Sequence, residues 1–203
     1  MKQLCRILPV LAIAFLVLGL SCAAMAQDVY KVNYFSNNAA PAPDAAPASL
    51  AITIPDATVR IDNPGLTYGN LCAMIYVFDA DQQLSECCGC VETHNGLRTL
   101  SVRLNLTSNP LTGRVSTNGV IKIVSAAVNN SPCDPTSNVS PKANLRAWGT
   151  HIQNPVGAAF PITETEFSDS TLGATELANL QAQCAFINIL GSNQGICSCG
   201  TGD

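Results

Sequence analysis

The stretch that decides the fold is residues 71–90, which read Leu-Cys-Ala-Met-Ile-Tyr-Val-Phe-Asp-Ala-Asp-Gln-Gln-Leu-Ser-Glu-Cys-Cys-Gly-Cys. Its first eight residues, 71–78, are apolar at both odd and even positions, which is typical of a central strand covered on both faces. The polar residues 79–82 turn the chain, and residues 83–88 are placed to return as the second strand of a hairpin. We therefore expect residues 71–78 to run through the centre of a β domain.

Short strand patterns continue on both sides of this hairpin. Residues 58–61, Thr-Val-Arg-Ile, show the period-two alternation of a half-buried strand, and the turn residues Asn63-Pro64-Gly65 follow them. The other predicted strands are residues 28–35, 51–54, 97–106, 119–126, 145–152 and 161–168. Many short strands separated by turn signals favour a mainly β fold, an antiparallel β-sandwich. A distorted barrel is the alternative.

One α-helix is expected near the C-terminus, over residues 175–190. Thr175 is a suitable N-cap, and Gly191 is well placed to end the helix. The apolar stripe of this helix consists of Leu177, Leu180, Cys184 and Ile187. We expect the stripe to pack on the sheet rather than to bind a partner.

The first 26 residues predict a signal peptide. A basic start is followed by the apolar residues 7–20 and by Ala24-Met25-Ala26, which matches a cleavage site after residue 26. Residues 1–26 would therefore be removed during export. Lipidation of Cys22 is the alternative form of processing.

The mature chain, residues 27–203, has 177 residues, which is enough for one domain with its own core. We expect an N-terminal strand and an Ala/Pro-rich linker in residues 27–49, then the sandwich with its helix and Cys-rich tail in residues 50–203. Losing Lys2 and Arg6 leaves 8 basic against 14 acidic residues, a net charge of −6. Scattered basic residues argue against nucleic acid or an anionic membrane surface as partner.

The predicted location is secreted or extracytoplasmic, in the periplasm or at the cell surface. No later stretch is apolar enough for a transmembrane segment in the mature chain. A partner, if there is one, is therefore expected at the cell surface or outside the cell.

Eight cysteines remain after cleavage, and an even number in an exported chain predicts a disulfide framework. They are Cys72, Cys87, Cys88, Cys90, Cys133, Cys184, Cys197 and Cys199. Cys87 and Cys88 are adjacent, so their Cα atoms, about 3.8 Å apart, are too close for an unstrained disulfide. We expect Cys197 and Cys199 to staple the C-terminus to residues 87–90, and the sequence leaves the full connectivity open.

A metal site is the rival interpretation of the same cysteines. The clusters at residues 87–90 and 197–199, together with His94, offer thiolates and an imidazole to zinc or copper(I). Exported thiols tend to oxidise, which favours disulfides over a metal centre or a redox-active dithiol. We therefore expect no metal and no other cofactor.

Few residues form a catalytic pattern. His94 precedes an Asn-Gly turn and is expected in an exposed loop, whereas His151 lies on a predicted strand, where a structural role is expected. Glu164 and Glu166 would share one face of a strand. A carboxylate pair can hydrolyse glycosides, but a solvated polar face is the preferred interpretation. The sequence therefore predicts no catalytic residue.

The sequence offers residues for two further kinds of binding site. Asp79 and Asp81, joined by Glu86 if the hairpin closes on it, would offer carboxylates to calcium, but a polar hairpin turn is preferred. Carbohydrate binding usually needs an aromatic platform. Trp148 is the only tryptophan and is expected to be a core anchor, and Tyr76 is also expected in the core.

Residues 72–90 and the tail Gly-Ile-Cys-Ser-Cys-Gly at 195–200 resemble, as a set, exported cysteine-rich bacterial proteins that carry no assigned function. The resemblance implies no particular activity. The preferred hypothesis is a secreted or cell-surface β domain with a structural, adhesive or ligand-binding role that is not an enzyme. The alternatives are a secreted hydrolase that uses Glu164, Glu166 or His151, and a thiolate metal-binding protein.

Overall fold

The computed structural model describes residues 28–37, 55–66, 69–128, 132–137, 140–157, 159–189 and 191–200. The predicted signal peptide, Cys22 within it, the predicted strand at 51–54 and most of the predicted linker lie outside these residues.

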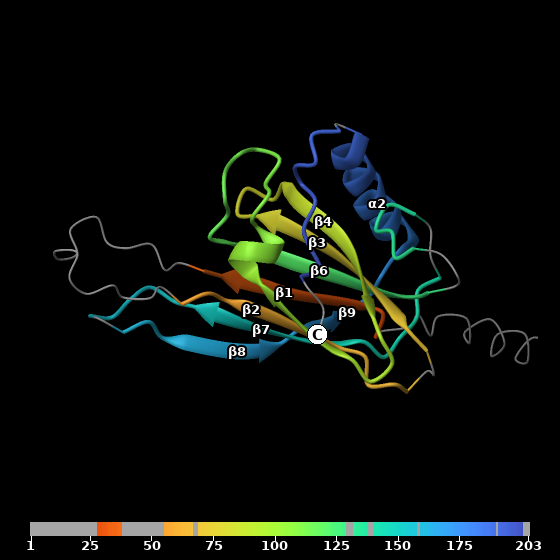
Figure 1. Ribbon diagram of the computed structural model, residues 1–203, viewed down its shortest axis with the longest axis horizontal. Coiled ribbons are helices and arrows are strands. Elements are labelled where there is room, and N and C mark those ends of the chain that lie inside the picture. The colour runs from red at the N-terminus through yellow and green to blue at the C-terminus, as the bar shows by residue number, and fades with distance from the viewer. Residues whose placement is uncertain are drawn as a thin grey trace, which may run out of the picture.

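Two antiparallel β-sheets form a sandwich, as the sequence predicts (Figure 1). The strand order is β4-β3-β6-β1-β9 in the five-stranded sheet and β5-β2-β7-β8 in the four-stranded sheet. The five-stranded sheet consists of β1 (Tyr30–Ser36), β3 (Leu71–Asp79), β4 (Leu84–Glu92), β6 (Asn118–Ala127) and β9 (Ser168–Ser170). The four-stranded sheet consists of β2 (Thr58–Asp62), β5 (Leu97–Ser101), β7 (Arg146–Ile152) and β8 (Ile162–Glu166).

Strand β3 contributes to two separate cores, which explains its apolar residues at both parities. Leu71, Ala73, Ile75 and Val77 point into the core between the two sheets. The alternate residues Cys72, Met74 and Tyr76 point to the opposite side of the same sheet and form a second core there. All seven side chains are at most 1% exposed, so a strand covered on both faces is confirmed.

Helix α2 (Ala174–Ile189) covers this second side of the five-stranded sheet (Figure 1). Leu180, Cys184 and Ile187 of the predicted stripe are buried in the second core. The first turn is tied to the sheet by Glu176, whose Oε1 accepts hydrogen bonds from Lys122 Nζ at 2.7 Å and Tyr30 Oη at 3.0 Å. The helix therefore packs on the sheet, as predicted.

The predicted strand 97–106 is only half correct. Strand β5 ends at Ser101, and residues Val102–Leu106 form one turn of π-helix. Ser101 Oγ accepts a hydrogen bond from Leu104 N, and Ser101 N donates to Asn105 Oδ1. Side chains that satisfy the backbone locally compete with strand pairing, so the chain coils here while Val102 and Leu106 stay buried.

The predicted strand 161–168 is divided between the two sheets. Strand β8 pairs with β7 in the four-stranded sheet, and β9 pairs with β1 in the five-stranded sheet. Phe167 lies between them, is 3% exposed and belongs to the core between the sheets. Burial of this ring at the crossing point explains why the chain changes sheets there.

Strand β1 lies inside the five-stranded sheet, between β6 and β9. The sandwich therefore includes a strand from the N-terminal segment 27–49. The end of β1 also reaches the other sheet: Ser36 Oγ donates to Ile152 O at 2.7 Å, and Asn37 forms a parallel bridge with Ile152. These contacts close one open side of the sandwich.

Candidate functional site

Four disulfides join the eight cysteines that the sequence singles out. The pairs are Cys72–Cys133, Cys87–Cys184, Cys88–Cys197 and Cys90–Cys199, with Cα–Cα distances of 5.1–5.9 Å. These separations fit ordinary disulfide geometry. Several disulfides in one chain are typical of an oxidising environment outside the cytoplasm.

Strand geometry decides which partner each cysteine of β4 meets. Cys88 and Cys90 point into the core between the sheets, where they bond Cys197 and Cys199 of the tail. Cys87 points to the opposite side and bonds helix α2. Cys87 and Cys90 have the spacing of a Cys-x-x-Cys redox motif, but they lie on opposite faces of the strand, so they do not act as a dithiol pair.

The C-terminal tail covers the edge of β4 and links the two sheets. Cys87 N donates to Gly195 O at 2.9 Å, and Cys197 N donates to Cys87 O at 3.2 Å, so the tail lies alongside the strand. Beyond it, Ser198 N donates to Asn105 O at 2.9 Å in the π-helical turn. An uncovered edge strand invites pairing with other chains, and the stapled tail prevents this at β4.

The cysteines that the metal hypothesis would use form disulfides. The Sγ atoms of Cys88, Cys90 and Cys199 lie within 4.8 Å of one another, but each of them takes part in a disulfide. A thiolate metal site needs deprotonated, unbonded sulfur. His94 Nε2 lies instead 3.2 Å from Gly65 O in an exposed hairpin turn and is not a member of the cysteine cluster.

Two buried carboxyl groups flank the disulfides on β4. Glu92 is paired with Arg98, whose Nε lies 2.8 Å from Glu92 Oε1, yet burial raises the pKa of Glu92. Glu86 is fully buried, and burial raises its pKa to about 7 against a weaker opposing effect of the hydrogen bond from Asn109 N. No hydrogen-bond partner is found for Glu86 Oε2 among the described residues. Glu86 therefore lies in the interior.

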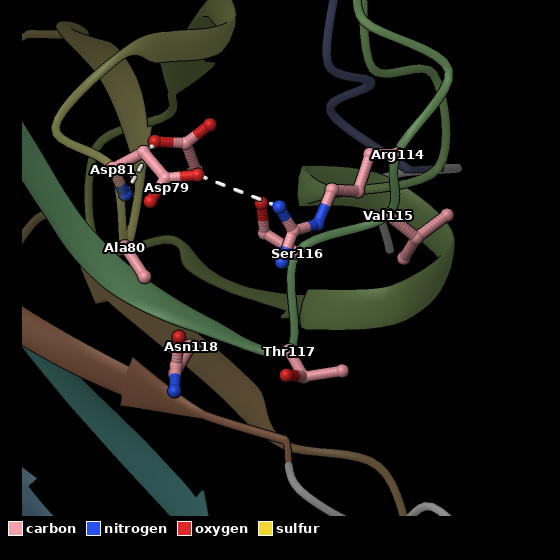
Figure 2. Close-up of a pocket in the computed structure, with 8 residues that line it drawn as sticks. All are labelled: Asp79, Ala80, Asp81, Arg114, Val115, Ser116, Thr117 and Asn118. Atoms are coloured by element: carbon pink, nitrogen blue, oxygen red, sulfur yellow. Dashed lines mark hydrogen bonds and ion pairs between the residues drawn. The ribbon is translucent and has the colours of Figure 1, made fainter.

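A polar pocket of about 220 Å³ lies where β3 ends and β6 begins (Figure 2). Its lining includes Asp79, Asp81, Arg114 and Ser116, and it does not include Glu86, which the sequence offered as a third calcium ligand. Asp79 Oδ1 accepts hydrogen bonds from Asp81 N and Gln83 N, both at 2.9 Å. Arg114 Nη1 lies 3.4 Å from Asp81 Oδ2. The carboxylates thus stabilise the turn and face an arginine, which suits a polar hairpin turn better than a calcium site.

His151 lies on β7 and is buried on the inner face of the four-stranded sheet. Its Nε2 lies 2.7 Å from Thr165 Oγ1, and its ring stacks on Tyr34 with centroids 3.9 Å apart. Burial lowers the pKa of His151, which favours the neutral ring. No partner for Nδ1 is found among the described residues, so the histidine lacks the orienting carboxylate of a hydrolytic triad.

The structure does not bring the residues of the hydrolase hypothesis together. Glu164 and Glu166 pair with Thr150 and Trp148, whereas His151 pairs with Thr163. Adjacent residues of a strand point to opposite faces, so both glutamates lie on the outer face of the sheet and His151 lies on the inner one. Glu164 is bound to Arg60, with Nη1 and Oε2 2.6 Å apart.

Trp148 lies on the outer face of the four-stranded sheet, so its expected position as a core anchor is wrong. Gly149 faces inward, since a Cβ atom there would meet Asn33 and Phe167, and Trp148 therefore faces outward. It is half-buried between Arg60 and Glu166, its partners on the neighbouring strands. Tyr76, by contrast, is fully buried, as predicted. The sequence does carry a signal for the outward position of Trp148, because this residue shares its parity along the strand with the polar residues Arg146 and Thr150.

The outer face of the four-stranded sheet is hereafter called the open face. Its residues are Thr58, Arg60, Asp62, Leu97, Thr99, Ser101, Arg146, Trp148, Thr150, Ile162, Glu164 and Glu166. All of them are half-buried or exposed, and none belongs to either core. The face is therefore mostly polar, with one large aromatic ring near its middle.

An apolar groove of about 450 Å³ lies on the other side of the molecule, between α2 and the β3–β4 hairpin. It is lined by Leu84, Leu111, Phe186 and Ile187 among others, and Phe186 is 60% exposed. The sequence predicts no such groove, because it depends on how the helix sits against the hairpin.

Within the described residues, none of the helices has the length and apolar character needed to cross a bilayer. Comparisons with protein-family models, with curated proteins and with solved structures found no match to this chain.

Proposed function

We propose that the protein is a secreted or cell-surface β domain that binds an extracellular partner through the open face and is not an enzyme. The observation that supports this most strongly is the contrast between this face and the rest of the molecule. Trp148, Arg60 and Glu166 lie side by side on adjacent strands, yet they pack into neither core. Such side chains add little to folding and are accessible to a partner.

The disulfides support both the location and the role. All four have at least one end on β3 or β4, and both ends lie outside the four-stranded sheet. They therefore stabilise the scaffold and leave the open face unconstrained. A binding domain exposed to proteases and to fluctuating conditions outside the cell gains from such covalent links.

Export is part of the proposal and has its own test. The basic and apolar start of the chain and the Ala-Met-Ala sequence at 24–26 support cleavage after residue 26. Expression of the full chain in its own host, followed by fractionation and N-terminal sequencing, should find a chain that begins at Gln27 outside the cytoplasm. An uncleaved chain in the cytoplasm would contradict export.

Binding is tested with labelled protein added to intact cells and to extracellular material of the producing organism. The variant Thr99→Arg/Glu166→Arg places bulky charges on the two outermost strands of the open face, on either side of Arg60 and Trp148. The matched control Asp81→Arg/Gln183→Arg makes the same change in charge, but it alters the polar pocket and the apolar groove.

We expect the open-face variant to weaken binding by about tenfold or more, and the control to bind like the natural chain. If the control loses binding and the open-face variant keeps it, the site is the pocket or the groove. If the natural chain binds neither cells nor extracellular material, the proposed role is wrong.

A further inference from the structure

Resting on the proposed function, we infer that the open face binds a polysaccharide chain, with the indole ring of Trp148 as the stacking platform. The face is the outer surface of one antiparallel sheet, formed by four neighbouring strands. Four side chains form a row across it, in the order Thr99, Arg60, Trp148 and Glu166, each opposite the next in the strand register. With strands about 4.8 Å apart, the row is roughly 14 Å long, which accommodates several sugar rings.

The chemistry of this row fits a sugar. A pyranose ring has an apolar face of C–H groups and a rim of hydroxyls, so it is best bound by an aromatic ring surrounded by hydrogen-bonding groups. Trp148 supplies the ring, and its indole is partly accessible. Arg60 donates hydrogen bonds, Glu166 accepts them, and Thr99 does both. A hydroxyl group both donates and accepts, so it needs this mixture.

One pair of these groups is held in place before any ligand arrives. Arg60 on β2 reaches across β7 to Glu164 on β8, and the ion pair is 2.6 Å long. The two side chains are still 42% and 45% exposed. Fixed but accessible polar groups beside Trp148 reduce the entropy lost when a sugar chain binds.

The same composition argues against other macromolecules. The core of a protein–protein interface is depleted of charged residues, whereas Trp148 lies between the charged residues Arg60 and Glu166. The other large apolar residues of the open face, Leu97 and Ile162, lie on its two outermost strands rather than beside Trp148. Glu164 and Glu166 would repel the phosphates of nucleic acid. A neutral polysaccharide, or one built of N-acetylated amino sugars, carries no phosphates for the glutamates to repel and needs no apolar cluster on the face.

The test uses the fluorescence of Trp148, which is the only tryptophan in the chain and therefore reports directly on this face. The probes are soluble oligomers of glucose, N-acetylglucosamine, xylose and mannose, and muropeptide fragments of peptidoglycan. We expect at least one class to shift or quench the emission saturably. Pull-down on the matching insoluble polymer should then show that Trp148→Ala weakens binding by about tenfold or more.

The matched control is Phe186→Ala, which removes an exposed aromatic ring from α2 instead. It should bind the polymer like the natural chain, and circular dichroism should show that both variants are folded. Equal loss in the two variants, or no response to any sugar, would overturn the inference.

The two proposals fail in different ways. If the open-face double variant loses binding to cells while no sugar binds, the open face is a binding site but not for a glycan. If a concentration-dependent dimer appears and Trp148→Ala abolishes it, the occupant is a second copy of this chain, and the glycan inference is wrong.

Discussion

The two outer faces of the sandwich differ in how far their side chains are buried. On the five-stranded sheet, Cys72, Met74 and Tyr76 are at most 1% exposed because α2 and the loop that carries Cys133 cover them. On the four-stranded sheet, every described residue of the open face is half-buried or exposed. The first face stabilises the fold through burial and disulfides. The second buries little apolar surface and therefore contributes little to stability.

If this comparison is correct, changes on the five-stranded sheet should cost much stability and changes on the open face should cost little. The largest effect is expected from Cys88→Ala/Cys90→Ala/Cys197→Ala/Cys199→Ala, which removes both disulfides of the tail without leaving a free thiol. Because Cys87–Cys184 still joins β4 to α2, the tail disulfides close a loop of about 15 residues, for which the chain-entropy model gives about 3 kcal/mol. Truncation of the buried cysteine side chains adds to this loss.

Urea unfolding of this variant, with free-thiol titration to show that the other disulfides remain, measures the loss. A variant as stable as the natural chain would show that the staple does not hold the tail to β4.

The next effect concerns Glu86 and pH. Burial raises the pKa of Glu86 to about 7 in the folded chain, from 4.5 for an exposed carboxyl group. The folded state therefore binds more protons between these values, and the free energy of unfolding falls by about 3 kcal/mol as pH rises from 4.5 to 7. Above pH 7 this loss is complete.

Glu86→Gln removes this titration and keeps the shape of the side chain. Urea unfolding from pH 4 to 8 should show the variant less sensitive to pH than the natural chain, and more stable than it above pH 7. Parallel curves for the two proteins would contradict the burial of an unpaired carboxyl group at this position.

A smaller loss is expected from Gly89→Ala on β4. A Cβ atom at this position would lie 1.9 Å from the carbonyl oxygen of Cys133, so the loop held by the Cys72–Cys133 disulfide would have to shift. Overpacking of this kind costs about 2 kcal/mol. Gly173→Ala is the control, since no atom lies within 4 Å of its Cβ position. Equal thermal midpoints for the two variants would contradict close packing of this loop on β4.

The smallest effect is expected on the open face. Arg60→Ala removes an ion pair whose two side chains are 42% and 45% exposed, and exposed pairs contribute less than about 1 kcal/mol. Urea unfolding should therefore place this variant within error of Gly173→Ala. A loss as large as that of Gly89→Ala would mean that the open face also supports the fold.

The parts of the fold that follow from local pattern were predictable. Residues 71–78 are apolar at both parities, and this pattern correctly indicates a strand between two cores. The odd and even positions of Cys87 and Cys88 likewise send them to different partners. Such features depend only on the period of the strand.

The remaining features depend on contacts between distant segments. The sequence does not reveal that the predicted strand 161–168 changes sheets at Phe167, because the position of the other sheet decides where this ring is buried. The sequence predicts Trp148 in the core because a lone tryptophan in a chain with few aromatic residues is more often a core anchor than a platform. Its neighbours Ala147 and Gly149 occupy the inner face instead, where the sheets lie too close for a large side chain.

Hydroxyl-radical footprinting of the natural chain, alone and bound to the extracellular material that captures it, tests the central claim most directly. Trp148 and Phe186 should both be oxidised in the free protein. On binding, Trp148 should become protected while Phe186 on α2 stays reactive. Protection of Phe186 with no change at Trp148 would show that the partner binds the covered side, and would contradict a binding role for the open face.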